Sequence, residues 1–556
     1  MNRTVTRREF LKLIGTSGIV ALAAGFTKSC VRGYGSLPPR MGQVDPDKYG
    51  IMILADGLRA DLFFEMLEAN KLPLIKENIV DRGAVMECVG SLPSTTGPAH
   101  LPFLTGTLPG RNHVTGIRWM DRRSRICRDY CTGLEGVLIN NDYGLEVPTL
   151  FEILHGENTA AIYGIVNKGA THIKLPALRE AWWASGGDWE QFDTKAADLV
   201  EDLYKRRPLR FAFVWMPGID HLAHFEGPTS ETVQRAVMNV DKQVGRIVDA
   251  LKRCDIYDRT LISLVADHGL RDNEKHVELV DHLADFGLNV KRELGAEGEW
   301  AIIHRYNAVV AVSGNAFAHV YLCDDEGKLG ESVSTHGWKW ESKKELKALF
   351  QHGWKWEKEA AYESIRSFPV GGDKRIDLVE ALLDQKGIGI LIVAEKWGKY
   401  LIFSSSGRGV IERDSDGYRY SFQGDDPLGY ADTTDTAALV ADGKFHSGDE
   451  WLKASWDNSH PDAVMQICQL FDSHRCGDMV VLAAPGWDLM DEGHIGSHGS
   501  MEREEIMVPV VLAGPGIAKK RSKYARTIDI FPTYMRFFGL NPGPLEIDGR
   551  VLDVFA

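Results

Sequence analysis

Tyr49–Gly57 reads YGIMILADG, a continuous apolar run that ends in an aspartate and a glycine. A short unbroken run of this kind predicts a strand that is buried on both faces. The same arrangement recurs at Phe213–Asp220 (FVWMPGID) and Leu261–Asp267 (LISLVAD). Amphipathic helical patterns alternate with these runs, as at Asp61–Asn70 and Glu231–Arg253. We therefore expect an α/β fold with a mostly parallel sheet sandwiched by helices.

Side chains that bind metals follow the apolar runs. In a parallel sheet, ligands gather at the carboxyl ends of the strands. Three carboxylates and three imidazoles suit Zn²⁺ and are enough for two ions. The candidates are Asp56, Asp220, His224, Asp267, His268 and His498. Paired metals can hold the attacking and leaving oxygens of a displacement at phosphorus. The pattern predicts a metal-dependent phosphoric ester hydrolase.

Composition restricts the class of substrate. The chain has 556 residues, 44% of them hydrophobic and 26% charged, so a large core is available. The formal net charge of −14 argues against binding a nucleic acid polymer by neutralising its backbone. A small-molecule phosphate ester or nucleotide remains compatible with this charge, because metals and a few local cations can recognise phosphate.

The N-terminus has the layout of a twin-arginine (Tat) export signal. Thr6–Lys12 reads TRREFLK, and a modest apolar stretch follows at Leu13–Gly25. That stretch is shorter than the ~20 residues that span a bilayer. We expect residues 1–30 to direct the chain through the Tat machinery to a periplasmic or extracellular location. An alternative is that the exported protein is a lipoprotein, with the lipid attached at Cys30.

A long insertion separates His268 from His498. We expect residues 45–275 and 478–556 to form the core and residues 276–477 to form a smaller capping subdomain. The insertion contains a local repeat, because His336–Glu341 (HGWKWE) recurs as His352–Glu357. Two copies exclude a solenoid. Either a surface helical element was duplicated, or the tryptophans form a patch that contacts a substrate or partner.

Five segments in order resemble the alkaline phosphatase superfamily, and within it the type I phosphodiesterase/nucleotide pyrophosphatase family. The segments are DG at 56–57, the threonine-containing run PSTTGPAHLPFLTGTLPGRNHVTG, D-x-x-x-H at 220–224, DHG at 267–269 and HG at 498–499. The resemblance covers about residues 48–275 and 478–552. It implies an alkaline phosphatase-like core and a two-metal hydrolase.

The resemblance divides the ligands between two zinc ions. Asp220, His224 and His498 would hold one ion. Asp56, Asp267 and His268 would hold the other, together with the oxygen of the nucleophile. Asp220 and His224 share a face if their segment is helical. His221 is a neighbouring alternative that we expect to lie outside the ligand set.

The family pattern P-x-x-T-x-P places the nucleophile at Thr96, at the start of a helix expected over residues 99–104. Ser94 and Thr95 are the alternatives, and each could instead cap that helix. Phosphate would then be transferred to Thr96, giving a phosphothreonine intermediate. A helix N-terminus at this point would favour phosphate oxygens.

The sequence indicates the type of reaction more clearly than it indicates the substrate. The family usually carries an asparagine after the nucleophile helix, and Thr115–Trp119 has none. Arg118 could contact a phosphate oxygen instead, or form a surface ion pair, and Lys168 is a weaker candidate. We therefore expect a phosphodiesterase or nucleotide pyrophosphatase. A phosphomonoesterase and a non-catalytic periplasmic binding protein are the alternatives.

Overall fold

The computed structural model describes residues 41–131, 135–144, 146–176, 187–291, 303–324, 353–543 and 545–556. The export signal expected at residues 1–30, Cys30 and the first copy of the repeat lie outside these ranges. The chain divides into two compact units. Unit 1 comprises Met1–Val114, Tyr130–Asp272 and Gly493–Ala556, and unit 2 comprises Thr115–Asp129 and Asn273–Glu492. Within the described ranges, no helix has the length and hydropathy needed to cross a membrane.

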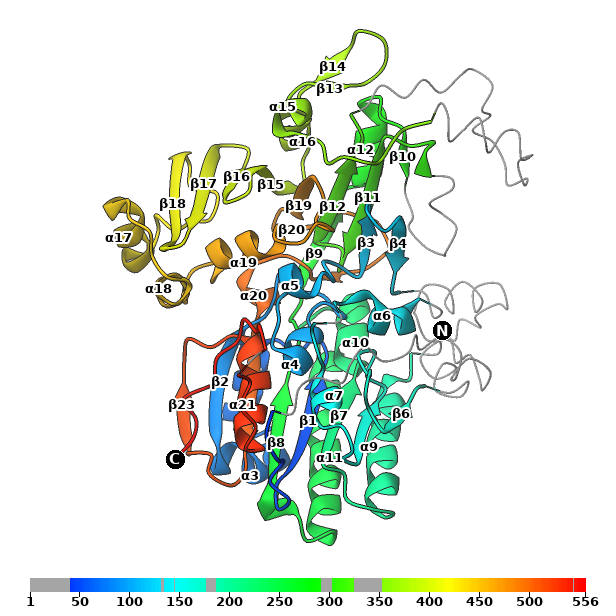
Figure 1. The fold of residues 1–556 in the computed structure, drawn as a ribbon, viewed down its shortest axis with the longest axis vertical. Coiled ribbons are helices and arrows are strands. Elements are labelled where there is room, and N and C mark those ends of the chain that lie inside the picture. Colours follow the sequence, from blue (N-terminus) through cyan, green and yellow to red (C-terminus); the bar gives the residue numbers. More distant parts are fainter. Residues whose placement is uncertain are drawn as a thin grey trace, which may run out of the picture. The chain divides into compact units, whose positions relative to one another are not determined.

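Unit 1 is built on an eight-stranded sheet with the order β23-β2-β22-β8-β1-β7-β5-β6 (Figure 1). β1 lies between β7 and β8 and is parallel to both. β22 is antiparallel to both of its neighbours, β8 and β2. The strands are β1 (Tyr49–Ala55), β2 (Ala84–Val89), β5 (Thr159–Ile162), β6 (His172–Lys174), β7 (Phe211–Met216), β8 (Thr260–Val265), β22 (Met507–Ala513) and β23 (Lys520–Ser522).

The core of unit 1 sits around β1, whose residues Ile51–Ala55 are fully buried. α11 (Glu231–Arg253) has the bounds that its apolar periodicity predicts, and Ser230 caps it by accepting a hydrogen bond from the backbone N–H of Val233. α11 packs against α9 (Trp189–Tyr204), as Figure 1 shows. The remaining helices are α2 (Ala60–Glu68), α3 (Pro73–Asn78), α4 (Leu101–Thr105), α5 (Pro109–Asn112), α6 (Ile139–Asp142), α7 (Leu150–Ile153), α10 (Gly218–Glu226), α20 (Arg503–Ile506) and α21 (Ile530–Phe537).

Unit 2 contains a second eight-stranded sheet, with the order β10-β11-β12-β19-β15-β16-β17-β18. Its pairings are antiparallel except for β10 with β11. The strands are β10 (Val290–Lys291), β11 (Ala308–Ser313), β12 (Phe317–Leu322), β15 (Ile388–Lys396), β16 (Lys399–Phe403), β17 (Gly407–Asp414), β18 (Gly417–Gly424) and β19 (Met479–Ala483). Its helices are α12 (Leu279–Asp285), α15 (Tyr362–Ile365), α16 (Leu378–Leu383), α17 (Thr434–Asp442), α18 (Gly448–Ala454) and α19 (Ala463–Leu470).

These sheets correct the expected architecture in two respects. The fold is mixed α/β: the unit 1 sheet contains the antiparallel strand β22, and the unit 2 sheet is largely antiparallel, so the prediction of a mostly parallel sheet is not confirmed. β19, expected in the core with residues 478–556, pairs with β12 and β15 in unit 2. An apolar run identifies a buried strand, but it specifies neither the direction of that strand nor the sheet that it joins. The expected capping role of residues 276–477 stays a prediction.

The second copy of the HGWKWE repeat is described from Gly353 onward. It forms no helix, and Trp356 is buried with 1% of its surface exposed. Trp356 packs with Met120, Tyr321 and other apolar side chains of unit 2. The expectation of a helical surface element or an exposed aromatic patch is therefore wrong for this copy, because Trp356 belongs to the core.

Candidate metal centre

Three buried aspartates come together in unit 1. Asp56 directly follows β1, Asp267 lies two residues after β8, and Asp220 is near the start of α10, which follows β7. The backbone N–H of Asp220 donates to the carbonyl of Asp56 over 3.1 Å. Gly57 permits this approach: its φ is +72°, and a Cβ there would lie 2.7 Å from the Cα of Asp220.

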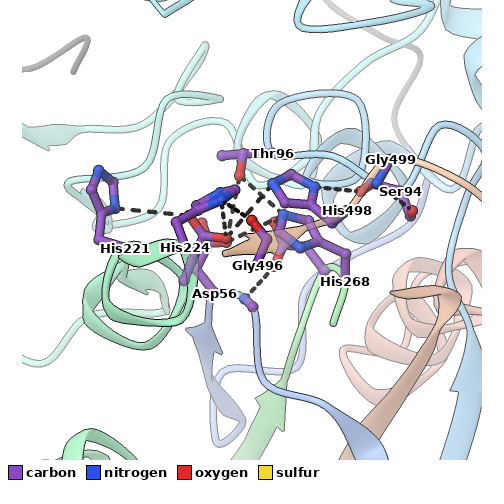
Figure 2. A network of polar contacts seen from close by, with 12 residues as sticks. Asp56, Ser94, Thr96, His221, His224, His268, Gly496, His498 and Gly499 are labelled. Carbon is purple, nitrogen blue, oxygen red and sulfur yellow. Dashed lines mark hydrogen bonds and ion pairs between the residues drawn. The ribbon is translucent and has the colours of Figure 1, made fainter. Parts of the chain in front are cut away.

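The carboxylates and imidazoles form two groups that could each hold a metal ion. One group is Asp56, Asp267 and His268, and the other is Asp220, His268 and His498. Within each group the ligand atoms lie within 4.8 Å of one another. His268 belongs to both groups, which places them side by side (Figure 2).

His224 approaches the second group from the same helix as Asp220. Its Nε2 is 3.6 Å from Asp220 Oδ1, as expected for residues four apart on one helical face. His498 Nε2 is 3.7 Å from the same oxygen. His221 lies to one side (Figure 2), where its ring lies against Trp189 at a centroid distance of 3.8 Å. Its Nδ1 is nevertheless 3.8 Å from Asp220 Oδ2.

The Asp220 carboxylate has the surroundings of a metal ligand. Its Oδ1 is buried and accepts no hydrogen bond from the described residues. Burial, together with the nearby Asp56 and Asp267, raises the pKa of Asp220 well above its usual range. Clustered buried carboxylates are costly without a compensating cation. The site therefore fits a divalent metal ion.

The histidines are oriented by the backbone. In each ring, Nδ1 faces a carbonyl oxygen, which leaves Nε2 directed at the carboxylates. The pairs are His224 with Gly496 at 2.8 Å, His498 with Ser94 at 2.8 Å and His268 with Gly269 at 3.2 Å. Burial lowers the pKa of both His224 and His498 well below the usual value, so these rings are neutral, which is the form that binds metals.

Thr96 points at the two groups. Its Oγ1 is 3.1 Å from His268 Nε2 and 3.4 Å from Asp56 Oδ1 (Figure 2). Ser94 faces elsewhere, because its hydroxyl donates to the carbonyl of Ser500 over 2.6 Å. Thr95 is fully buried. Of the three hydroxyl residues in this segment, Thr96 is the one that the structure places beside the candidate ligands.

The helix expected over residues 99–104 forms as α4 (Leu101–Thr105), but it starts two residues later than expected. Residues 96–100 are turns, and α4 begins only at Leu101. Gly97 has a φ of +95°, which residues other than glycine rarely adopt. A continuous α-helix contains no residue with such a φ. The helix N-terminus therefore lies five residues beyond the hydroxyl and does not supply the partial positive charge expected there.

Sequence reasoning missed two residues that hold the aspartates in place. His100 Nε2 is 3.1 Å from Asp267 Oδ2 and 3.7 Å from Asp56 Oδ2. Burial alone would lower the pKa of His100, but the two carboxylates outweigh burial and raise it to about 9. Trp215 donates its indole N–H to Asp56 Oδ2 over 2.5 Å. His100 lies only four residues after Thr96 in PSTTGPAH, whereas Trp215 sits in an apolar strand and gives no polar signal.

The two candidate phosphate contacts already have partners. Arg118 belongs to unit 2, where its Nε is 3.0 Å from Asp129 Oδ2 and its Nη1 donates to the carbonyl of Val312. The Nζ of Lys168 lies 3.4 Å from Glu152 Oε1 and 5.1 Å from the centroid of the Tyr143 ring. Each cation is therefore engaged by a carboxylate of its own unit.

Residues 51–419 match the family model of type I phosphodiesterase / nucleotide pyrophosphatase. The chain belongs to this family. Members of the family are phosphodiesterase and pyrophosphatase hydrolases, and the matched range contains Thr96 and every candidate ligand except His498.

Curated relatives of this chain are distant. Human ectonucleotide pyrophosphatase/phosphodiesterase family member 5 is 19% identical over 254 residues, which cover 43% of this chain and 49% of the human protein. An uncharacterized pyrophosphatase/phosphodiesterase of Schizosaccharomyces pombe is 22% identical over 232 residues, which cover 40% of this chain and 44% of the yeast protein. The matches thus span about half the length of these relatives.

One solved structure of a distant relative shows the same fold. Human ectonucleotide pyrophosphatase/phosphodiesterase 5 superimposes with a TM-score of 0.50 at 11% identity, covering 89% of this chain and 96% of that chain. An inactive form of the murine protein in complex with AMP gives a TM-score of 0.49 at 13% identity, covering 90% and 97%.

Proposed function

We propose that this member of the family is an exported two-zinc hydrolase that cleaves phosphodiester or nucleotide pyrophosphate bonds through a phosphothreonine at Thr96. The observation that carries the proposal is the position of the Thr96 hydroxyl. It lies within hydrogen-bonding distance of His268, the residue common to both candidate metal groups. A nucleophile needs this proximity to the groups that would hold its target phosphate.

The ligand chemistry supports zinc. Mixed carboxylate and imidazole ligands suit Zn²⁺, whereas Mg²⁺ prefers an all-oxygen shell. Asp56, Asp267 and His268 would hold one ion, and Asp220, His224 and His498 the other. When bound, the two ions would neutralise charge on the phosphate and favour the ionised form of the threonine hydroxyl.

The proposed reaction proceeds in two steps at Thr96. Thr96 Oγ1 forms a bond to phosphorus while the bond from phosphorus to the leaving oxygen breaks, which releases an alcohol or a nucleoside phosphate. Water then breaks the new bond between phosphorus and Thr96 Oγ1 and restores the free hydroxyl. His100 and Trp215 keep Asp56 and Asp267 in place throughout.

A phosphodiesterase or nucleotide pyrophosphatase is the favoured activity, because the chain belongs to that family. A phosphomonoesterase would need cations for the additional charge of a terminal phosphate. Arg118 and Lys168 are the cations that sequence reasoning offered for this purpose, and both are engaged by carboxylates. A non-catalytic binding protein would not need a hydroxyl beside the ligand groups.

The test is a comparison of hydrolysis rates for bis-(4-nitrophenyl) phosphate, a nucleotide 4-nitrophenyl ester and 4-nitrophenyl phosphate. We expect both diesters to be cleaved with a kcat/KM at least about tenfold above that of the monoester. A preference for the monoester would establish the phosphomonoesterase alternative. Absence of turnover on all three substrates by zinc-loaded protein would establish the binding protein.

Export through the Tat machinery is part of the same proposal, and it rests on Arg7 and Arg8. Residues 1–30 fused to a reporter should direct that reporter to the periplasm of a Tat-competent bacterium. Replacing both arginines by lysine should retain the fusion in the cytoplasm. Equal export of the two fusions would contradict the proposal.

A further inference from the structure

Three arginines are among the residues that line a small cavity in unit 2. Its volume is about 230 Å³, and its lining residues are Arg122, Arg123, Arg125, His304, Trp356 and Glu357. None of these residues belongs to the metal centre or to the proposed reaction. A concentration of arginine stands out in a chain whose net charge is −14.

The arginines come from one tight turn. Arg122, Arg123 and Arg125 connect β3 (Arg118–Asp121) to β4 (Ile126–Asp129). Asp121 stabilises the turn, because its Oδ1 accepts hydrogen bonds from the backbone N–H groups of Arg123 and Ser124. Arg125 adopts a φ of +60°, which is uncommon for a residue other than glycine.

Arg122 supplies a fixed positive charge at the cavity. Its side chain is 4% exposed and pairs with the buried carboxylate of Asp478 through Nη2. Its Nε and Nη1 are also buried and have no hydrogen-bond partner among the described residues. The guanidinium lies near the rings of Tyr321 and Trp356, at 5.3 and 5.7 Å. A buried guanidinium with two unsatisfied nitrogens is costly. Both nitrogens are shielded from solvent, so an anion in the cavity would lower that cost through electrostatic attraction.

Asp478 does not neutralise the turn as a whole. In addition to pairing with Arg122, its oxygens accept hydrogen bonds from the backbone N–H groups of Leu322 and Ala360. Arg123 and Arg125 are exposed, and within the described ranges neither forms an ion pair with a carboxylate. Glu357 is the single acid among the lining residues. The cavity therefore keeps an excess of positive charge.

The described copy of the HGWKWE repeat completes the cavity wall. The indole N–H of Trp356 donates to the carbonyl of Ile303, and the backbone N–H of Trp354 donates to the carbonyl of His304. These bonds fix Trp356 and His304 in the wall. The described copy therefore forms part of the wall of the arginine-lined cavity.

We propose that this cavity is a binding site for a small phosphorylated anion, either inorganic phosphate or a phosphate monoester. Guanidinium groups donate two parallel hydrogen bonds to phosphate oxygens, and several arginines on one short turn match the charge of a dianion. The volume lies below the ~300–1,000 Å³ typical of sites for larger ligands, so the occupant is small.

The test uses the full chain and inorganic phosphate, with arginine-specific modification as a site-resolved measurement. Phenylglyoxal should modify the exposed Arg123 and Arg125, and peptide mass spectrometry reports each residue separately. Phosphate should slow modification of both residues by about fivefold or more, whereas acetate at equal ionic strength should not. Methylphosphonate, in place of phosphate, tests whether a monoester-like anion binds in the same way.

A calorimetric titration with phosphate measures the affinity. Arg123→Gln together with Arg125→Gln should raise the Kd of this site at least about tenfold, because two charge-assisted contacts are lost. The matched control is Arg206→Gln with Arg207→Gln, which removes two exposed arginines that follow α9 in unit 1. The control should leave the Kd unchanged. Arg122 is left intact, because its removal would strand Asp478 as an unpaired buried charge.

The outcomes separate this site from the metal centre. Chelation should abolish any phosphate binding at the metal centre, but it should leave the protection of Arg123 and Arg125 intact. Equal phosphate affinity in the double variant and in wild type would overturn the proposal, as would equal protection by acetate. Protection that disappears with the metals would also overturn it. These measurements of phosphate binding do not require hydrolytic activity, so they test the cavity even if the proposed reaction is wrong.

Discussion

The imidazole ring of His268 stacks on that of His498, with centroids 3.8 Å apart and planes 10° from parallel. Two protonated rings at this distance would repel each other. Burial, and then the proximity of His268, lowers the pKa of His498 well below its usual value. His498 is therefore neutral over the physiological range, and its Nε2 is available as a ligand. The stacked pair connects the candidate metal groups, because His268 belongs to both.

Removing the metals should abolish activity. After treatment with a chelator we expect no measurable hydrolysis of a diester, and Zn²⁺ should restore activity better than Mg²⁺, because imidazole ligands favour zinc. Metal content measured by mass spectrometry should approach two zinc ions per chain on recovery. Full recovery with Mg²⁺ alone would exclude His224, His268 and His498 as ligands.

Thr96→Ala should lower kcat by about 10³-fold or more, as loss of a nucleophile does. The zinc content should remain near that of wild type, because the hydroxyl is only one contact among several side chains. Thr95→Ala is the matched control, since Thr95 is adjacent and buried, but its hydroxyl forms no hydrogen bond with any described residue. The nucleophile would have to be reassigned if the Thr95 variant lost activity and the Thr96 variant kept it.

His100→Gln should weaken zinc binding about 10- to 100-fold, in line with the loss of a residue that orients ligands. His100 contacts Oδ2 of both Asp56 and Asp267, whereas Thr96 contacts Asp56 through Oδ1, so the role of His100 is positioning. We expect excess Zn²⁺ to restore most of the activity of this variant. A kcat that stays low at saturating zinc would instead indicate a direct role in the reaction.

Arg118→Ala should change kcat/KM less than about threefold on either monoesters or diesters, because Asp129 and Val312 already engage the guanidinium. The variant should lose about 1–3 kcal/mol of unfolding free energy, the usual contribution of partly buried charged hydrogen bonds. Asp129→Asn should destabilise unit 2 similarly in urea unfolding. A fall in kcat/KM near 10²-fold would revive Arg118 as a phosphate contact.

Patterns along the chain predict the parts of this molecule that depend on local periodicity. The helix at Glu231–Arg253 has its predicted bounds, because its apolar stripe and its serine cap agree. Asp220 and His224 share a helical face because their spacing of four matches the helical turn. Asp56 and Asp267 meet because parallel strands end at one edge of the sheet.

Features that depend on tertiary context were not predictable in this way. Nothing in the residues of β22 shows that it runs antiparallel, and nothing in Met479–Ala483 shows that this strand joins unit 2. In the sequence, Trp215 cannot be distinguished from an ordinary core tryptophan. Only the structure shows that its indole N–H donates a hydrogen bond to Asp56. The ends of short helices are equally uncertain, and Thr96 proved to lie in a turn before α4.

Gly57→Ala should disrupt the metal centre through its backbone. An alanine there would adopt a strained left-handed φ of +72° and place its Cβ 2.7 Å from the Cα of Asp220. Gly156→Ala is the matched control, because Gly156 has a φ of +91° but no heavy atom within 4 Å of the added Cβ. The control variant carries only the conformational cost of about 1–2 kcal/mol, and it should retain zinc and activity. Gly57→Ala carries in addition the steric overlap, which separates Asp56 from Asp220, so zinc content and kcat/KM should both fall at least about tenfold. Equal zinc content in the two variants would mean that the close approach of these two aspartates is not needed to hold the metals.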